Sequence, residues 1–150
     1  MTEAGTNYRA DTMSTVNHSG PFNKSMNKPK SKSQNKSIGA FGEKAVAEYL
    51  VAGGATILDR NWRIKEGEID IVARSGDGKI IFTEVKTRSS LAFGHPLESI
   101  TKEKSRRLQR LAMAWLATHR ALGAEFQIDC AAVLIGSAGQ HSIEYRANVL

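Results

Sequence analysis

The pattern of apolar and polar residues divides the chain into a polar N-terminal stretch and a patterned remainder. Apolar residues recur at helical spacing from Ile38 to Leu50, and Gly53-Gly54 ends the periodicity, so the pattern predicts a helix there. Residues 1–37 lack this periodicity and are rich in Ser, Asn, Lys and Thr. The sequence therefore predicts a disordered basic tail at 1–37 and a folded domain at 38–150.

Beyond the helix, short β-type segments are separated by turn residues. Strands are expected at 56–64, 68–74 and 79–87, with a turn at Ser75-Gly76-Asp77-Gly78 before the last of them. A long helix is expected from about Ser99 to His119, followed by strands at 126–135 and 142–148. The order helix, three strands, helix, one or two strands predicts an α/β fold, with a mixed central sheet flanked by helices.

Charge and composition add expectations about partners and location. The net charge is +6, of which residues 1–37 contribute +4, and such a basic balance fits a polyanion such as nucleic acid. The lysine-rich segment from Lys24 to Lys36 is either a nucleic-acid-binding arm or a solvated extension. No apolar run is long enough to cross a bilayer and the N-terminus lacks a signal-like apolar segment, so a cytoplasmic protein without membrane contact is expected. The single cysteine, Cys130, excludes an internal disulfide and is expected to be a core residue.

The most informative residues lie on the second and third predicted strands, as Glu68-Ile69-Asp70 and Glu84-Val85-Lys86. Alternation places Glu84 and Lys86 on one face with Ile80 and Phe82, and Asp70 on a face with Val72. The opposite faces then carry Ile69, Ile71 and Ala73, and Ile81, Thr83 and Val85. If the hairpin folds symmetrically about Asp77, Asp70 faces Glu84 at about 5 Å between Cβ atoms, and Val72 faces Phe82.

Two carboxylates this close repel each other unless a proton or cation lies between them. A hard divalent ion, Mg²⁺ or Mn²⁺, is the expected partner, with Asp70, Glu84 and the Val85 carbonyl as ligands. Glu43, on the first helix, could bind the ion directly or through water. Lys86 could orient or deprotonate a nucleophile, or stabilise developing negative charge, and the sequence leaves these roles open. A surface hairpin with cross-strand ion pairs is the structural alternative.

Basic residues near this hairpin are candidate phosphate ligands. The segment from Lys102 to Arg110 holds five basic residues and one acid, and Lys104 and Arg107 are its preferred pair because they lie one helical turn apart. Arg88 follows Lys86 on the same face. A solvated helix face is the alternative for this segment. Glu68 is either a neighbour of the metal ligands or the solvent-exposed start of its strand.

These residues together resemble the PD-(D/E)xK nuclease superfamily and, more closely, the YraN family of predicted endonucleases related to archaeal Holliday junction resolvases. Ile69 stands where the superfamily pattern has proline. The resemblance covers residues 38–150 and implies a restriction-endonuclease-like core with catalytic roles for Asp70, Glu84, Lys86 and Glu43. It rests on Gly39-Ala40-Phe41-Gly42-Glu43, Asn61-Trp62-Arg63, Gly67-Glu68-Ile69-Asp70-Ile71, Glu84-Val85-Lys86-Thr87-Arg88, Phe93-Gly94-His95-Pro96, Ile100-Thr101-x-x-Lys104 and Phe126-x-Ile128-Asp129.

The sequence therefore predicts a metal-dependent DNA endonuclease, with branched or damaged DNA as its candidate substrates. A nucleic-acid-binding module with the nuclease fold but no cleavage activity is the first alternative. A structural protein in which the acids form ion pairs is the second. Resemblance to resolvases also implies a homodimer, since a four-way junction offers paired scissile strands.

Overall fold

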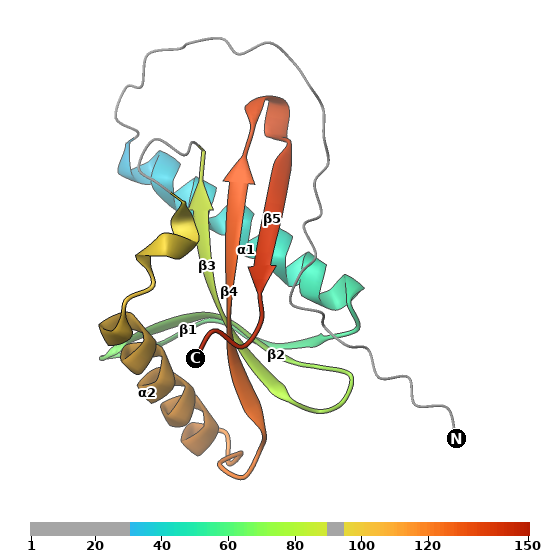
Figure 1. Ribbon diagram of the computed structural model, residues 1–150, viewed down its shortest axis with the longest axis vertical. Helices are drawn as coiled ribbons and strands as arrows, with labels where there is room; N and C mark the ends of the chain where they lie inside the picture. The colour runs from blue at the N-terminus through green and yellow to red at the C-terminus, as the bar shows by residue number, and fades with distance from the viewer. Residues whose placement is uncertain (1–30, 90–94) are drawn as a thin grey trace.

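The computed structural model describes residues 31–89 and 95–150, and its first helix begins earlier than expected (Figure 1). Helix α1 (Lys32–Ala52) starts ahead of the predicted Ile38, so the boundary of the tail at residue 37 is wrong by this short segment. Ser31 and Gln34 form a capping box: the Ser31 hydroxyl accepts from the Gln34 amide and the Gln34 side chain accepts from the Ser31 amide. The rest of the predicted tail, 1–30, lies outside the described residues.

The strands form one mixed sheet, as predicted. Strands β1 (Thr56–Ile64), β2 (Gly67–Arg74), β3 (Ile80–Arg88), β4 (Phe126–Ile135) and β5 (His141–Arg146) follow one another in space in this order. The pair β3 and β4 is parallel, and every other neighbouring pair is antiparallel. A parallel pair needs a crossover, and the chain makes it through helix α2 (Lys102–Thr118). The predicted α/β class and element order are confirmed.

The stretch before α2 differs from the single long helix that the sequence predicts. A short 3₁₀ helix, η1 (Pro96–Ser99), comes first, and α2 starts only after Thr101, whose side chain accepts from the Lys104 amide. Thr101 is an N-cap residue, which the apolar periodicity alone does not reveal. Phe93 and Gly94, part of the resemblance, lie outside the described residues. A second short 3₁₀ helix, η2 (Ser137–Gly139), links β4 to β5.

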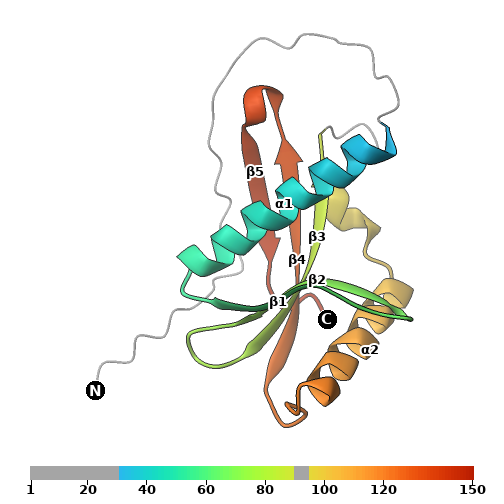
Figure 2. The ribbon, with the colours of Figure 1, turned by 180° about the vertical axis from the view of Figure 1, so that it is seen from behind.

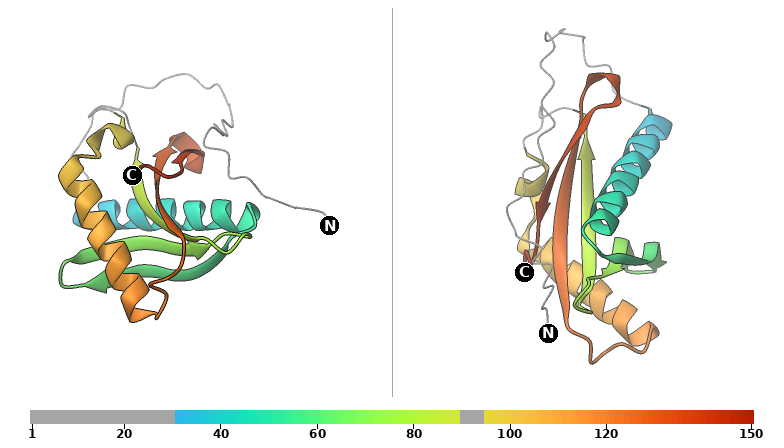
Figure 3. Two further views of the ribbon diagram at one scale, coloured as in Figure 1. Left: turned by 60° about the horizontal axis from the view of Figure 1, so that its bottom comes forward. Right: turned by 90° about the vertical axis from the view of Figure 1, so that its right-hand side faces the viewer.

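The helices pack on opposite faces of the sheet. Helix α1 passes behind the strands in Figure 1 and in front of them in Figure 2, and lies to one side of them in the edge-on view of Figure 3. Its Val46 and Leu50 pack with Ile71, Ile81 and Val133. The α2 face holds a second cluster: Ile69, Val72, Ile80, Phe82, Leu108, Leu111, Ala112, Trp115, Leu116 and Ile128. Within 31–89 and 95–150, neither long helix is apolar enough to span a membrane.

Two polar-looking residues of β4 belong to the interior. Cys130 is 1% exposed, as expected for a core residue, and burial raises the pKa of its thiol to about 12. Asp129 is buried and accepts hydrogen bonds from the Tyr145 hydroxyl, the Gln127 side chain and the Asn148 amide. Because these donors satisfy its carboxylate, Asp129 joins β4 to β5 and to the segment after it.

Candidate active site

The candidate site lies at a fork where β2 separates from β3. Val72 faces Phe82, as the symmetric hairpin predicts, and the last pair of this ladder is Ile71 with Thr83. One residue further, the regular pairing stops before Asp70 and Glu84 become partners. Instead the Val85 amide donates to Asp70 Oδ2 at 2.7 Å. The carboxylate of Asp70 thus takes the place of a backbone acceptor at the point where the strands part.

The fork also changes the face on which Ile69 lies. Alternation predicts Ile69 on the face of Ile71, but Ile69 packs with Val72 in the α2-side cluster. The first half of β2 pairs with β1 and not with β3, as the Trp62–Ile69 pair shows, so it is free to turn away from the plane of the central strands. The prediction for Ile69 is therefore wrong, and Asp70 lies at the turning point.

The two carboxylates at the fork are buried and close enough to influence each other. Asp70 and Glu84 are each 8% exposed. Desolvation above all, together with the negative charges of Glu84, Glu43 and Glu68, raises the pKa of Asp70 to about 7 against the lowering effect of the Val85 hydrogen bond. A carboxyl group in this state binds a proton or a cation readily.

Lys86 is the cation nearest to Glu84. Its Nζ lies 3.1 Å from Glu84 Oε1, and its side chain is 27% exposed, whereas that of Glu84 is 9% exposed. The lysine thus links a buried carboxylate to the open side of the site. Alternation along β3 places both side chains on the face of Ile80 and Phe82, as predicted, and these two residues pack with α2.

Glu43 reaches the site because α1 passes very close to the end of β3. A Cβ atom built on Gly42 would lie 1.8 Å from Thr87 Oγ1, so the contact requires glycine at this position. Glu43, the next residue, lines the same cleft as Asp70 and Glu84. This close contact of helix and strand explains why a helical acid lies beside residues of the sheet.

The cleft at the fork has a volume of about 530 Å³. Its lining contains two arginines: Arg107 of α2, which the sequence predicts, and Arg63 of β1, which it does not. Arg63 pairs with Glu68 at 2.9 Å, and the two residues are cross-strand partners of β1 and β2. Glu68 is therefore a half-exposed residue of the rim. The complete lining is Glu43, Arg63, Ile64, Gly67, Glu68, Asp70, Glu84, Val85, Lys86 and Arg107.

The other predicted phosphate ligands lie next to the cleft. Desolvation and the charge of Lys86 lower the pKa of Lys104, so the two ammonium groups are neighbours. Arg88 lines an adjoining cavity of about 380 Å³ together with Glu43 and Lys86. Its Nη1 donates to the Thr87 carbonyl at 3.1 Å. The structure thus gathers all the predicted basic residues around one end of β3.

The donor set at the fork fits a hard divalent cation. Among the described residues, no group of three or more His, Cys, Asp or Glu side chains lies close enough together to hold a metal ion. Asp70 and Glu84 are two carboxylates, and Asp70 Oδ1 is not used by the Val85 hydrogen bond. Mg²⁺ commonly binds one or two protein carboxylates and keeps several waters, so this smaller set suffices. Glu43 lines the same cleft but does not form such a group of three with Asp70 and Glu84 in the described part of the chain.

Fold and site together define an α/β protein with a buried pair of acids and a lysine at a strand fork. Residues 42–133 match the family described as "Uncharacterised protein family UPF0102". The chain belongs to this family. It is 50% identical to a UPF0102 protein of Beutenbergia cavernae over 112 residues, which cover 75% of this chain and 94% of that one. It is 48% identical to a UPF0102 protein of Arthrobacter sp. (strain FB24) over 112 residues, with the same coverage.

The chain also has distant similarity to solved structures. One is a repair endonuclease from Pyrococcus abyssi, with 14% identity and a TM-score of 0.39. The match covers 77% of this chain and 42% of that one, so this chain spans less than half the length of that structure.

Proposed function

We propose that this protein is a metal-dependent endonuclease that hydrolyses phosphodiester bonds of DNA on a restriction-endonuclease-like core. The observation that carries the proposal is the fork itself, where two buried carboxylates and one lysine converge in an open cleft. A purely structural ion pair explains Glu84 with Lys86 but leaves Asp70 buried beside like charges. Such an arrangement lowers the stability of the folded state, and buried acids of this kind are typical of functional sites.

Asp70 and Glu84 would hold the metal ion, with the Val85 carbonyl as a further oxygen ligand. A bound Mg²⁺ or Mn²⁺ would supply Lewis-acid polarisation of the scissile phosphate and a lowered pKa for its water. The Val85 amide fixes Asp70 through Oδ2 and leaves Oδ1 free for this purpose. Asp70 would therefore need little rearrangement to accept a cation.

Lys86 would act on the phosphate. Its ammonium group is anchored at 3.1 Å from Glu84 and exposed to the cleft. With the charge of Glu84 shared with a bound cation, Lys86 would be available to contact a phosphate oxygen and to stabilise the charge that develops there. Arg107 at the cleft, together with Lys104 and Arg88 beside it, would neutralise flanking phosphates and position the strand.

The test is cleavage of labelled DNA in the presence of Mg²⁺ or Mn²⁺. The panel contains duplex, single-stranded, flap and four-way-junction substrates, because resemblance to resolvases favours branched DNA. Glu84→Gln and Lys86→Ala should each abolish cleavage by the full-length protein. Glu48→Gln is the matched control, since Glu48 is an exposed acid of α1 that pairs with Lys44 away from the cleft.

A second measurement separates a metal site from a purely structural ion pair. Mg²⁺ alone should raise the thermal unfolding midpoint of the parent and of Glu48→Gln, but not that of Glu84→Gln. DNA binding without cleavage of any substrate would contradict the endonuclease and favour the module. The absence of any Mg²⁺ effect on unfolding would contradict the metal site.

A further inference from the structure

A second pocket lies on the α2 face, between η1, the start of α2 and the end of β5. Its volume is about 540 Å³, within the usual range of about 300–1,000 Å³ for ligand pockets. Three cationic side chains line it, and none of its lining residues is acidic. The lining residues are Leu97, Ile100, Lys102, Ser105, Arg106, Arg146 and Val149.

The sheet places this pocket at a defined step from the proposed catalytic site. Cys130 on β4 is the register partner of both Glu84 on β3 and Arg146 on β5, so the three residues form one row across the sheet. Neighbouring strands lie about 4.8 Å apart, which puts the backbones of Glu84 and Arg146 about 10 Å apart. Leu97 of η1 packs with Cys130 in the middle of this row, and it lines the pocket but not the cleft.

Helix α2 presents cationic residues to both spaces from its first turns. Arg107 lines the cleft, whereas Lys102 and Arg106 line the pocket. A polyanionic strand that crosses the start of α2 would meet positive charge on both sides of the crossing. Positive charge therefore extends from the cleft to the pocket. A site for a separate small anion would need cationic residues in the pocket alone.

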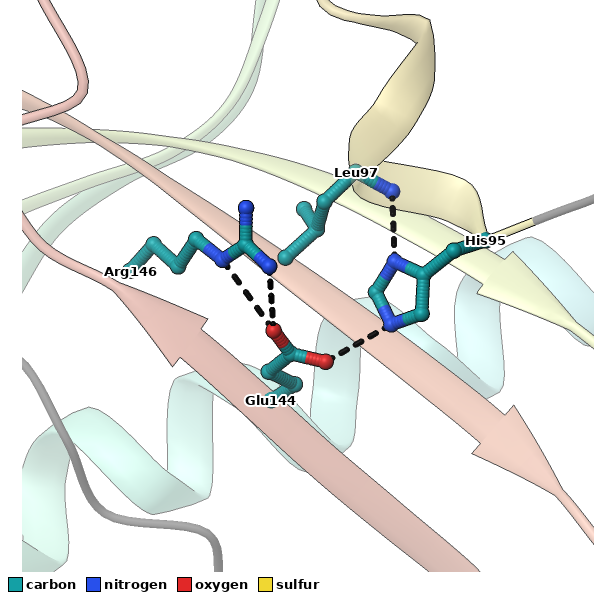
Figure 4. A network of polar contacts seen from close by, with 4 residues as sticks. All are labelled: His95, Leu97, Glu144 and Arg146. Carbon is teal, nitrogen blue, oxygen red and sulfur yellow. Dashed lines mark hydrogen bonds and ion pairs between the residues drawn. The ribbon is translucent and has the colours of Figure 1, made fainter.

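The walls of the pocket are held in place by Glu144 (Figure 4). Its Oε1 accepts from Arg146 Nη2 at 2.8 Å and from Nε at 3.1 Å, which leaves the Nη1 donors of Arg146 outside this pairing. Its Oε2 lies 2.7 Å from His95 Nε2. His95 Nδ1 accepts from the Leu97 amide at 3.2 Å, so Nε2 carries the ring proton and donates to Glu144. One carboxylate therefore fixes both the arginine wall and the η1 wall before any ligand binds.

The apolar part of the lining complements these charges. Leu97 is buried, and Ile100 and Val149 pack against it while remaining partly exposed. A nucleotide unit has the same two parts, a phosphate for the cations and a sugar and base for the apolar surface.

We propose that this pocket is a nucleotide subsite, which binds one phosphate with its sugar and base from the DNA strand that continues out of the catalytic cleft. The inference rests on the proposed function, because the strand enters the pocket from that cleft. A subsite of this kind predicts that the affinity for DNA depends on how many nucleotides the strand has on one side of the scissile bond.

Fluorescence anisotropy without divalent metal tests the subsite. The probe is a labelled duplex whose 5′ or 3′ single-stranded extension is lengthened by one nucleotide at a time. For the parent we expect affinity to rise by about tenfold at one particular length and at one of the two ends, as a subsite becomes filled. Arg106→Ala and Lys102→Ala should each remove most of that step.

Arg110→Ala is the matched control, because Arg110 is an exposed arginine one turn further along α2 and lines neither space. It should weaken binding equally at every length and keep the step. If Arg106→Ala keeps the step, or if the parent binds or cleaves DNA with no step at either end, the subsite is refuted while the proposed function stands. If folded parent protein neither binds nor cleaves any DNA, the proposed function fails, and the subsite fails with it.

Discussion

Asp70→Asn should make the metal-free protein more stable. The carboxyl group of Asp70 is buried beside other acids, and its pKa is about 7 instead of the ordinary 3.8. Asparagine has nearly the same shape and keeps an oxygen that can accept from the Val85 amide, but it carries no charge. The substitution therefore removes the cost of burying a charge and little else.

The size of the effect follows from the shift of about three pKa units, from 3.8 to about 7. Each unit corresponds to about 1.4 kcal/mol, so the ionised carboxylate costs up to about 4 kcal/mol of unfolding free energy near pH 8. Water in the open cleft screens part of this cost. We expect Asp70→Asn to gain about 1–3 kcal/mol at that pH.

The sign depends on pH in a defined way. Between pH 3.8 and about 7, folded Asp70 keeps a proton that the unfolded chain has lost. The folded state binds more protons in this window, so the stability of the parent falls as pH rises through it. The cost is absent below the window and complete above it. The Asn variant has no such slope from this position.

Urea unfolding in a metal-free buffer at several pH values measures the difference. Asp77→Asn is the contrasting control, because hydrogen bonds from Ser75 and Lys79 lower the pKa of this exposed turn residue. Removing the negative charge of Asp77 should therefore not stabilise the protein. The reasoning is refuted if Asp70→Asn is no more stable than the parent near pH 8, or if both lose stability in parallel from pH 4 to pH 7.

Three further predictions concern the framework and the DNA. Gly42→Ala forces a Cβ against Thr87 and should lower the unfolding free energy by about 1–3 kcal/mol in urea, with partial recovery in the double variant with Thr87→Ala. Tyr145→Phe removes a donor from buried Asp129 and should cost about 1–3 kcal/mol in the same assay; an unchanged midpoint would contradict the network. Arg107→Ala should reduce the salt dependence of DNA binding by about one phosphate contact, and an unchanged slope of affinity against salt would remove Arg107 from the interface.

The hairpin could be predicted closely because its turn chemistry fixes its register. Ser75-Gly76-Asp77-Gly78 defines the centre, and counting outward from Asp77 gives the observed pair of Val72 with Phe82. Counting fails at Asp70, since symmetry assumes that the two strands stay paired. The separation of β2 from β3 depends on how β2 packs with β1 and α2, which the hairpin sequence does not encode by itself.

Features governed by polar contacts were missed for a similar reason. Apolar periodicity does not detect the start of α1 at Lys32, where the signal is the Ser31 and Gln34 capping box. Arg63 joins the cleft through its cross-strand pairing with Glu68, and this requires the β1–β2 register. The α2-face pocket depends on η1 and the start of α2 lying beside Arg146 and Val149, which follow much later in the chain, and no local pattern specifies this contact.

The hydrogen bond from the Val85 amide to Asp70 Oδ2 makes this amide a spectroscopic reporter on the site. An amide proton held at this distance by a carboxylate resonates downfield, and its chemical shift changes when the acceptor gains a proton or shares its charge with an ion. The Val85 peak in a ¹⁵N-correlated NMR spectrum should therefore follow the titration of Asp70 and the arrival of Mg²⁺ without any attached probe. A single backbone resonance would then report the state of the fork in the intact protein.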